Sequence, residues 1–366
     1  MMRLSLFCFS FMSRNNPSAH VALTIASVIQ HHHSSALAWL RQSRKHFPPS
    51  SEHWSFLFNH DFDSLHKMLI CGTYNFSAAP IVTKANGEKV ALWCSSDAYV
   101  MKLLSLALTP VLPVHPLCSH TKGHKTRTIL HRLDVQTRSG DYPFVCRTDI
   151  KGYYANINKH QLLEKLSQHI RCPIIMNLLG QFLFYLVEEG GDFYESKQGI
   201  SRGSALSPLL GAFLLYDLDR SFENHPGIQY VRYMDDFVIL CKTRHKLRKT
   251  VRLLNQWLER FGFIQHPDKT FIGRVEKGFD WLGRWFTLAG LVGPSPRAIS
   301  NFANKLRQLY EQARKRPSLR EGLSYRVQQY ARRWNQWQGP TPSTWRCSNA
   351  ASHALPPARH HNSQCS

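Results

Sequence analysis

Two adjacent carboxylates, Asp235 and Asp236, lie inside an apolar segment that runs from residue 230 to residue 240. Carboxylates side by side in a buried strand cannot both stay ionised unless positive charge lies close to them. A divalent metal ion is the simplest source of that charge, and Mg²⁺ prefers hard oxygen ligands of this kind. The pair therefore favours metal-dependent phosphoryl transfer. The alternative is a solvent-exposed turn, because Asp is common in turns.

The residues that flank the pair have the pattern of β-strands. Ile228 to Tyr233 alternates in polarity, and Phe237 to Leu240 is a continuous apolar run. The turn between them lacks the Asn-Gly or Asp-Gly pair that tight hairpins commonly use. We therefore expect a β-hairpin that carries the two carboxylates, and this context favours a metal site over a plain turn.

A second strand must contribute a further carboxylate if two metal ions are to be held close together. Asp149 is the natural candidate, because it ends the apolar segment from Phe144 and is followed by a glycine at position 152. The chain between Asp149 and the hairpin is long enough for two helices to cross the sheet and return. Taken alone, Asp149 is better explained as a helix-entry cap or a turn residue.

The order of the elements around these carboxylates indicates an α+β fold. After the strand that ends at Asp149 come apolar helices, the hairpin and a basic helix, an order that fits an antiparallel sheet with helices on one face. Elsewhere the pattern predicts one short helix near the N-terminus and a basic loop or arm at 115–138. The predicted helices cover residues 20–30, 97–112, 158–170, 173–188, 208–218, 245–261, 296–314 and 318–337.

The charge of the chain predicts a polyanionic partner. It contains 46 Lys and Arg against 24 Asp and Glu, a formal net charge of +22, and its cations are interleaved with aromatic residues. This combination suits phosphate neutralisation and base stacking. Membrane-surface binding is the alternative, but no long basic amphipathic helix or membrane-length apolar run supports it. The nine Cys form no C-x-x-C pair, which argues against a zinc ribbon or a disulfide framework and favours a cytoplasmic protein.

Five blocks of this sequence resemble the palm of reverse transcriptases, in the order in which that family has them. Tyr233–Asp236 resembles the Y-x-D-D box, and Asp149–Tyr154 resembles the first catalytic motif. Gln198–Leu210 resembles the block between those two motifs. His266–Thr270 resembles the lysine motif, and Phe279–Gly283 resembles the primer-grip hairpin. Within the family, these motif sequences are most similar to those of bacterial enzymes of the group II intron and intron-like type, which belong to mobile elements. The reverse transcriptases of retrons and diversity-generating elements are related groups.

The resemblance implies a right-hand polymerase with fingers, a ferredoxin-like antiparallel palm and a helical thumb. We assign residues 1–50 to an irregular N-terminal segment, 51–140 to fingers with a basic insert, and 141–290 to the palm. A helical, basic, thumb-like segment follows at 291–338, and a disordered tail at 339–366. The fingers depart from the intron pattern at residues 87–93, so the residue that holds the triphosphate stays open.

The implied function is RNA-directed DNA polymerase, a nucleotidyltransferase that uses Mg²⁺, or Mn²⁺ in its place. Asp149 and Asp235 would bind both metal ions, and Asp236 would add negative charge or a further ligand. Lys269 would reach the pyrophosphate as a general acid, although a lone Lys on a surface turn is ordinarily just solvated. The implied partners are an RNA template, a DNA primer and deoxynucleotides, with no membrane.

Three further residues are implied to bind the incoming nucleotide. Tyr154 would lie under the sugar and exclude a 2′-hydroxyl, and Gln198 and the Gly199 backbone would border the nucleotide. The alternatives are that Tyr154 is a core tyrosine and that Gln198 and Gly199 belong to a structural turn.

Two other function classes compete with reverse transcription. One is another palm-type polymerase, an RNA-dependent RNA polymerase or a template-independent nucleotidyl transferase, against which Tyr154 argues. The other is a non-catalytic RNA-binding, maturase-like protein, against which three converging carboxylates argue, because they would repel a nucleic acid. The sequence leaves open the natural template, the priming mechanism, the biological programme and the oligomeric state.

Overall fold

The computed structural model describes residues 23–48, 51–59, 61–84, 87–120, 126–223, 225–315, 318 and 322–338. The chain forms two compact units, each made of segments that are separate in the sequence. The first unit comprises Met1–Val111, Lys159–Lys197 and Gly203–Leu206, and the second comprises Leu112–Asn158, Gln198–Arg202 and Ser207–Ser366. All the site residues predicted from the sequence belong to the second unit. The predicted disordered tail lies outside the described residues.

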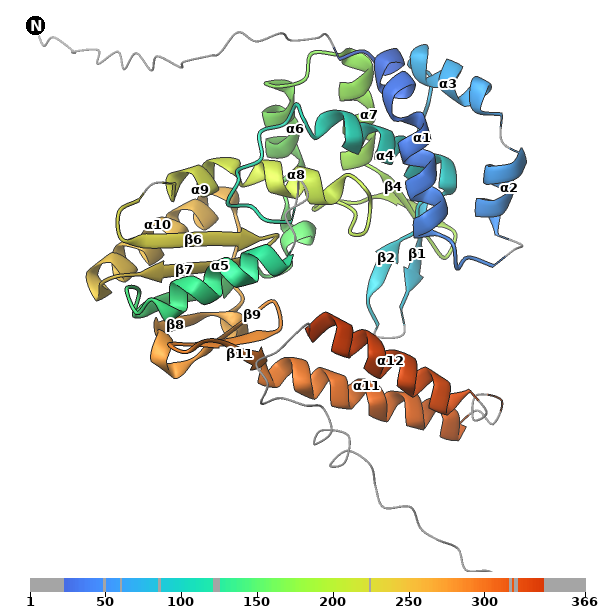
Figure 1. The fold of residues 1–366 in the computed structure, drawn as a ribbon. Helices are drawn as coiled ribbons and strands as arrows, with labels where there is room; N and C mark the ends of the chain where they lie inside the picture. The colour runs from blue at the N-terminus through green and yellow to red at the C-terminus, as the bar shows by residue number, and fades with distance from the viewer. Residues whose placement is uncertain are drawn as a thin grey trace, which may run out of the picture. The chain divides into compact units, whose positions relative to one another are not determined.

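The first unit packs helices with a small mixed sheet (Figure 1). Strands β1 and β4 are parallel neighbours at its centre, and β2 and β5 pair antiparallel at the edges. The helices are α1 (Ile25–Ser43), α2 (Glu52–Asn59), α3 (Phe62–Ile70), α4 (Ser95–Leu108), α6 (Lys159–Ser167) and α7 (Pro173–Leu183); the strands are β1 (Ala79–Thr83), β2 (Lys89–Ala91), β4 (Leu186–Glu189) and β5 (Asp192–Glu195).

Two predictions for this unit need correction. The segment 1–50, expected to be irregular apart from a short helix, contains the long helix α1. The helix expected at 173–188 ends at Leu183, and its last residues form β4 instead. Val187 is buried in β4 while its neighbours are more exposed, so sheet pairing overrides the helical pattern there.

The second unit contains a ferredoxin-like sheet, as predicted. Its strand order is β6-β7-β3-β8, and all neighbouring strands are antiparallel. Helices follow β3 and β7 in the sequence, which makes the β-α-β-β-α-β arrangement. The strands are β3 (Phe144–Asp149), β6 (Ile228–Tyr233), β7 (Asp236–Cys241) and β8 (Phe271–Arg274); the helices of this unit near the sheet include α8 (Ser207–Leu214), α9 (Tyr216–Ser221) and α10 (Arg244–Phe261). The α+β fold with antiparallel sheets is therefore confirmed.

Both faces of this sheet are covered, whereas we expected helices on only one. Helix α10 packs on β3 and β7 from one side. On the other side, Val238 and Leu240 join a core with helix α5 (Thr126–Arg138) and with Trp281 of a second, three-stranded sheet. That sheet consists of β9 (Phe279–Trp281), β10 (Arg284–Thr287) and β11 (Gly290–Pro294). The second apolar layer explains why β7 reads as a continuous apolar run and not as an alternating one.

Helix α5 also corrects the prediction of a basic loop or arm at 115–138. Ile129, Leu130 and Leu133 bury one face of α5, while its cations point outward. These three apolar positions are spaced for a helix, but the surrounding basic residues masked the pattern. Residues 121–125 of the insert lie outside the described residues.

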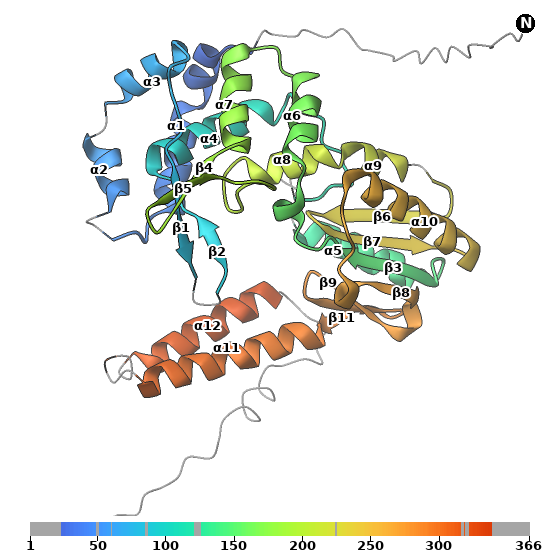
Figure 2. The same cartoon turned by 180° about the vertical axis from the view of Figure 1, so that it is seen from behind.

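The C-terminal part of the described chain is helical, as predicted, and its two helices form a hairpin. Helices α11 (Pro296–Lys315) and α12 (Leu323–Gln338) lie side by side (Figures 1 and 2). Phe302 of α11 stacks on Tyr330 and Trp334 of α12, with ring centroids 5.4 and 4.4 Å apart. The guanidinium of Arg284 lies 4.2 Å from the centroid of the Trp337 ring and donates to the Gln338 carbonyl at 2.7 Å, which ties the hairpin to β10. None of the described helices is long and apolar enough to cross a membrane.

Candidate active site

Strand pairing brings the three predicted carboxylates to one end of the sheet. Asp149, the last residue of β3, pairs directly with Asp236, the first residue of β7. Residues directly opposite each other have Cβ atoms about 4.5–5.5 Å apart. Asp235 precedes Asp236 in the hairpin turn, and its carbonyl accepts the Ile150 N–H at 3.1 Å. The β3 end and the hairpin turn are therefore joined by the backbone as well as by pairing.

Two cations lie among these carboxylates. Lys269, on the short 3₁₀ helix Pro267–Lys269, places its Nζ 2.6 Å from Asp149 Oδ2. Arg147 of β3 lies 3.5 Å from Asp236 Oδ1 and 3.6 Å from Asp280 Oδ2, and it donates to the Lys269 carbonyl. Arg147 was missed in the sequence, although a cation two residues before Asp149 in an apolar strand must lie on the same face as that carboxylate.

The carboxylates are short of positive charge despite these neighbours. Burial raises the pKa of Asp235, and the nearby Asp149 raises it further. Burial also raises the pKa of Asp236 to about 7, although Arg147 acts in the opposite direction. Asp236 Oδ1 is buried without a hydrogen-bond partner, because the contact with Arg147 is an ion pair without hydrogen-bond geometry. Further positive charge at this place would stabilise the ionised carboxylates.

The donor set fits a divalent cation. All three side chains supply hard oxygen atoms, the ligands that Mg²⁺ prefers, and the unpaired Oδ1 of Asp236 is a buried acceptor. In the part of the chain that the structure describes, no three acidic, His or Cys side chains are already grouped as a metal-binding cluster. Asp149 and Asp236 instead face Lys269 and Arg147, respectively.

Tyr154 lies beside the carboxylates, on the 3₁₀ helix Tyr153–Asn156. Its side chain is partly exposed, and burial together with the charge of Asp235 raises its pKa. Its ring packs on that of Tyr153, with centroids 5.2 Å apart. A Cβ on Gly211 of α8 would lie 3.0 Å from the Tyr153 ring and 3.2 Å from the Tyr154 ring. The glycine therefore leaves room for both aromatic rings.

The loop that contains Gln198 and Gly199 docks on the same 3₁₀ helix. Gly199 has a φ of +76°, and a Cβ there would lie 2.6 Å from the backbone of Ala155. Only glycine allows this approach. The next residue, Ile200, donates its N–H to the Tyr154 carbonyl at 2.8 Å. The side chain of Gln198 is exposed beside this contact, so the structure brings the three predicted nucleotide residues together.

The hairpin turn between β6 and β7 is held by a set of residues that the sequence did not reveal. Met234 has a φ of 54°, a left-handed conformation that costs a non-glycine residue about 1–2 kcal/mol. Its N–H donates to His120 Nδ1 at 3.0 Å, and its carbonyl accepts from Arg232 at 2.6 Å. Arg232 in turn donates to Asp219 at 2.7 Å, and both of these side chains are fully buried. We call His120, Arg232 and Asp219 the turn clamp.

His120 acts in the turn clamp as a neutral imidazole. Burial lowers its pKa to about 4, so Nδ1 accepts from Met234 while Nε2–H donates to the Pro208 carbonyl at 3.0 Å. The chain before His120 runs along the edge of β6, where the Arg232 N–H donates to the Leu117 carbonyl at 3.0 Å. No local sequence signal marks this role, because the partners of His120 lie far away in the sequence.

Comparison with known proteins places these motifs in context. The chain is 22% identical to Protein YkfC of Escherichia coli (strain K12), over 55% of this chain and 64% of that protein. It is similar to the solved telomerase from Candida albicans in complex with a fragment of telomeric RNA, with a TM-score of 0.49 and 12% identity over 66% of this chain and 51% of that one. It is also similar to a chain of a Cas6-RT-Cas1–Cas2 complex, with a TM-score of 0.38 and 21% identity over 64% of this chain and 41% of that one.

This chain therefore spans less than two thirds of each of these three proteins. The family model for reverse transcriptase (RNA-dependent DNA polymerase) matches residues 94–286, which is more than half of the chain and contains β3, the hairpin turn and Lys269. Reverse transcriptases generally use divalent metal ions, in keeping with the donor set described above. The chain belongs to the reverse transcriptase family.

Proposed function

We propose that this protein is an RNA-directed DNA polymerase that adds deoxynucleotides to a primer on an RNA template. The observation that carries the proposal is the pairing of Asp149 with Asp236 across β3 and β7, with Asp235 in the adjoining turn. Three carboxylates at one end of a sheet, two of them with raised pKa values, are suited to holding cations against phosphate oxygens. Membership of the reverse transcriptase family supports the same conclusion.

In this proposal Asp149 and Asp235 would hold two Mg²⁺ ions, which Mn²⁺ could replace, and Asp236 would supply further negative charge. The ions would stabilise charge on the attacking and leaving oxygens of an in-line displacement. Arg147 positions Asp236 and the Lys269 segment, because it contacts both. Lys269 donates a hydrogen bond from Nζ to Asp149 Oδ2 at 2.6 Å, and from this place it would protonate the leaving pyrophosphate as a general acid.

Tyr154, Gln198 and Gly199 form the nucleotide side of the proposed site. The ring of Tyr154 lies near Asp235 and would fill the space below the sugar, which selects deoxynucleotides. The Gly199 backbone fixes the loop that would border the base and sugar. Helices α11 and α12 are proposed as the thumb and the first unit as part of the fingers. Free, buried Cys118, Cys146 and Cys241 support a place in the reducing cytoplasm.

The test is extension of a DNA primer on an RNA template by wild type and by Asp235→Asn, with Mg²⁺ present. Removing one carboxylate charge should lower kcat by at least roughly 10²–10³-fold, because charge that is preorganised for the transition state is lost. Asp192→Asn is the matched control, since Asp192 is an exposed carboxylate on β5 outside the site. It should extend primers at the wild-type rate.

Binding of the template–primer should be nearly unchanged in Asp235→Asn, because the cations of the chain supply most of the affinity for phosphates. Equal extension rates for Asp235→Asn and wild type would show that the site assignment is wrong. A wild-type protein that extends no primer with either metal would contradict the proposed activity itself.

A further inference from the structure

Helix α10 carries a row of cations that its own fold does not use. Leu247, Leu254 and Leu258 are buried on the side that packs on the sheet. Over residues 244–252 the helix exposes four Lys and Arg side chains to solvent: Arg244, Arg248, Lys249 and Arg252. None of these four forms a salt bridge with a carboxylate among the described residues. We call the surface formed by these four residues the outer face of α10.

This charge arrangement destabilises the helix that carries it. Arg244, Arg248 and Arg252 follow one another at intervals of four residues, where like charges repel by about 0.2–0.5 kcal/mol per pair. The first turn contains Arg244, His245 and Lys246 and no acidic residue, although the positive end of the helix dipole favours acidic residues there. A solvated helix face gains nothing from this pattern. An anionic partner explains it, because binding of phosphates would relieve the repulsion.

A pocket of about 210 Å³ opens beside the outer face of α10. Its lining combines apolar Phe222, Ile228 and Leu253 with cationic Lys246, Lys249 and Arg252. The ring of Phe222 is buried and stacks on Tyr230, which makes the floor of the pocket rigid. The carboxylate of Glu223 approaches His115 at 3.3 Å and is not part of the lining. An apolar floor with a cationic rim suits a flat base with phosphates on either side.

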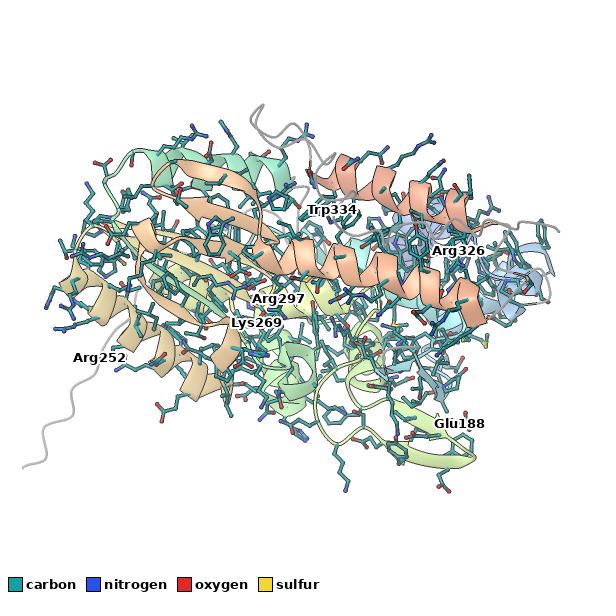
Figure 3. All side chains as sticks on the ribbon, turned by 90° about the horizontal axis from the view of Figure 1, so that it is seen from below. Glu188, Arg252, Lys269, Arg297, Arg326 and Trp334 are labelled. Carbon is teal, nitrogen blue, oxygen red and sulfur yellow. The ribbon has the colours of Figure 1, made fainter. Side chains whose placement is uncertain are left out.

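The pocket lies at the far end of β6 from the proposed catalytic carboxylates. Ile228 begins β6 at the pocket, whereas Tyr233 ends it next to the turn that contains Asp235. A strand of this length spans roughly 17 Å. Figure 3 shows Arg252 on α10 well apart from Lys269. A ligand in the pocket would therefore leave the catalytic carboxylates accessible to a template–primer.

We propose that the outer face of α10 and its pocket form a second RNA-binding site, which takes single-stranded RNA outside the catalytic site. Arg244, Arg248 and Arg252 bind successive phosphates, and one unpaired base enters the pocket against Leu253. RNA fits better than an acidic peptide, because the pocket between the cations is apolar and matches a base, not a carboxylate. The site is independent of the polymerase activity and would hold an RNA segment beyond the template–primer.

The test uses the full chain with its catalytic site filled by a template–primer hairpin, and a fluorescent oligouridine as the probe. The triple variant Arg244→Gln, Arg248→Gln, Arg252→Gln should weaken oligouridine binding by at least tenfold at low salt. The plot of log affinity against log salt should become less steep, its slope decreasing in magnitude by about 2, as expected for three lost phosphate contacts on a single strand. Extension of the hairpin primer should keep the wild-type rate, which also shows that the variant is folded.

A matched control removes the same charge elsewhere. Arg41, Lys45 and Lys67 are exposed cations of the first unit, and their replacement by Gln should leave the salt slope within about half a unit of wild type. The pocket has its own control in Leu253→Trp, which fills the pocket without changing charge. Wild type should bind oligouridine better than an abasic strand of equal length, and this preference should disappear in Leu253→Trp.

Three results would overturn the proposal. The first is a triple variant that binds oligouridine like wild type, or that loses no more affinity than the matched control. The second is equal binding of oligouridine and the abasic strand by wild type. The third is displacement of oligouridine by polyglutamate as effectively as by unlabelled RNA, which would assign the surface to an acidic protein partner.

Discussion

The turn clamp permits a sharp test of how the hairpin of the proposed catalytic carboxylates is held. In His120→Gln, the new side chain can still reach the Pro208 carbonyl, but it no longer places an acceptor at the position of Nδ1. The Met234 N–H then loses its partner. An orphaned donor costs about 1–3 kcal/mol, and because this bond is only partly buried we take the lower part, about 1–2 kcal/mol.

This cost is similar to the strain of the left-handed Met234, about 1–2 kcal/mol. Without the hydrogen bond, the turn is therefore free to relax to an ordinary backbone conformation that displaces Asp235. A change of 1–2 kcal/mol corresponds to roughly a 5–30-fold shift in population. We expect kcat for primer extension to fall by that factor. The KM for deoxynucleotides should stay near the wild-type value, because among the described residues no hydrogen bond or ring contact joins His120 to Tyr154 or Gly199.

The control is His120→Asn, whose side-chain oxygen lies near the former position of Nδ1. It keeps the acceptor for Met234 and loses the bond to Pro208. Both variants lose one hydrogen bond, so their melting temperatures should be lowered to a similar extent, while only His120→Gln should lose kcat. If the two variants lose kcat equally, or if kcat follows melting temperature in both, the turn clamp does not position the carboxylates.

Two further outcomes follow from the described geometry. Tyr154→Ala should raise the use of ribonucleotides relative to deoxynucleotides, measured as a ratio of kcat/KM values, because the space below the sugar is opened; an unchanged ratio would leave Tyr154 as a structural tyrosine. For His120, the folded pKa of about 4 lies below the ordinary value of 6.5, so the unfolded chain binds more protons as pH falls. His120 should therefore remove up to about 3 kcal/mol from the free energy of unfolding between pH 6.5 and 4, while Asp236, whose pKa is raised to about 7, acts in the opposite direction in wild type and variant alike. The difference between the pH profiles of wild type and His120→Asn, measured by denaturant titration, isolates the His120 contribution. Identical pH profiles would show that His120 is not buried as a neutral group.

The hairpin that carries Asp235 and Asp236 could be predicted from the sequence because its signals are local. The apolar strands on each side of Asp235 and Asp236 specify the pairing, and the motif order identifies Asp149 as the carboxylate from a second strand. The ferredoxin-like sheet follows from the same order of strands and helices. Lys269 could be named from its motif, although its contact with Asp149 could not.

Helix α5 shows why a local pattern can be too weak to predict an element. Its four apolar residues are interspersed with three Arg and one His, and they become a helix face only because a second sheet provides an apolar layer for them to join. Tertiary packing, not propensity, supplies most of the stability of such a helix.

The residues that hold the site in place were decided by tertiary structure alone. Arg147 is an ordinary basic residue in the sequence until the packing of the two sheets brings its guanidinium within 3.5 Å of Asp236 and 3.6 Å of Asp280. His120 gains its role from a turn more than a hundred residues away, and Arg232 from a carboxylate on α9. Each of these contacts is made across elements that are separate in the chain. Their partners are therefore chosen by the packing of the fold, which no spacing along the sequence can express.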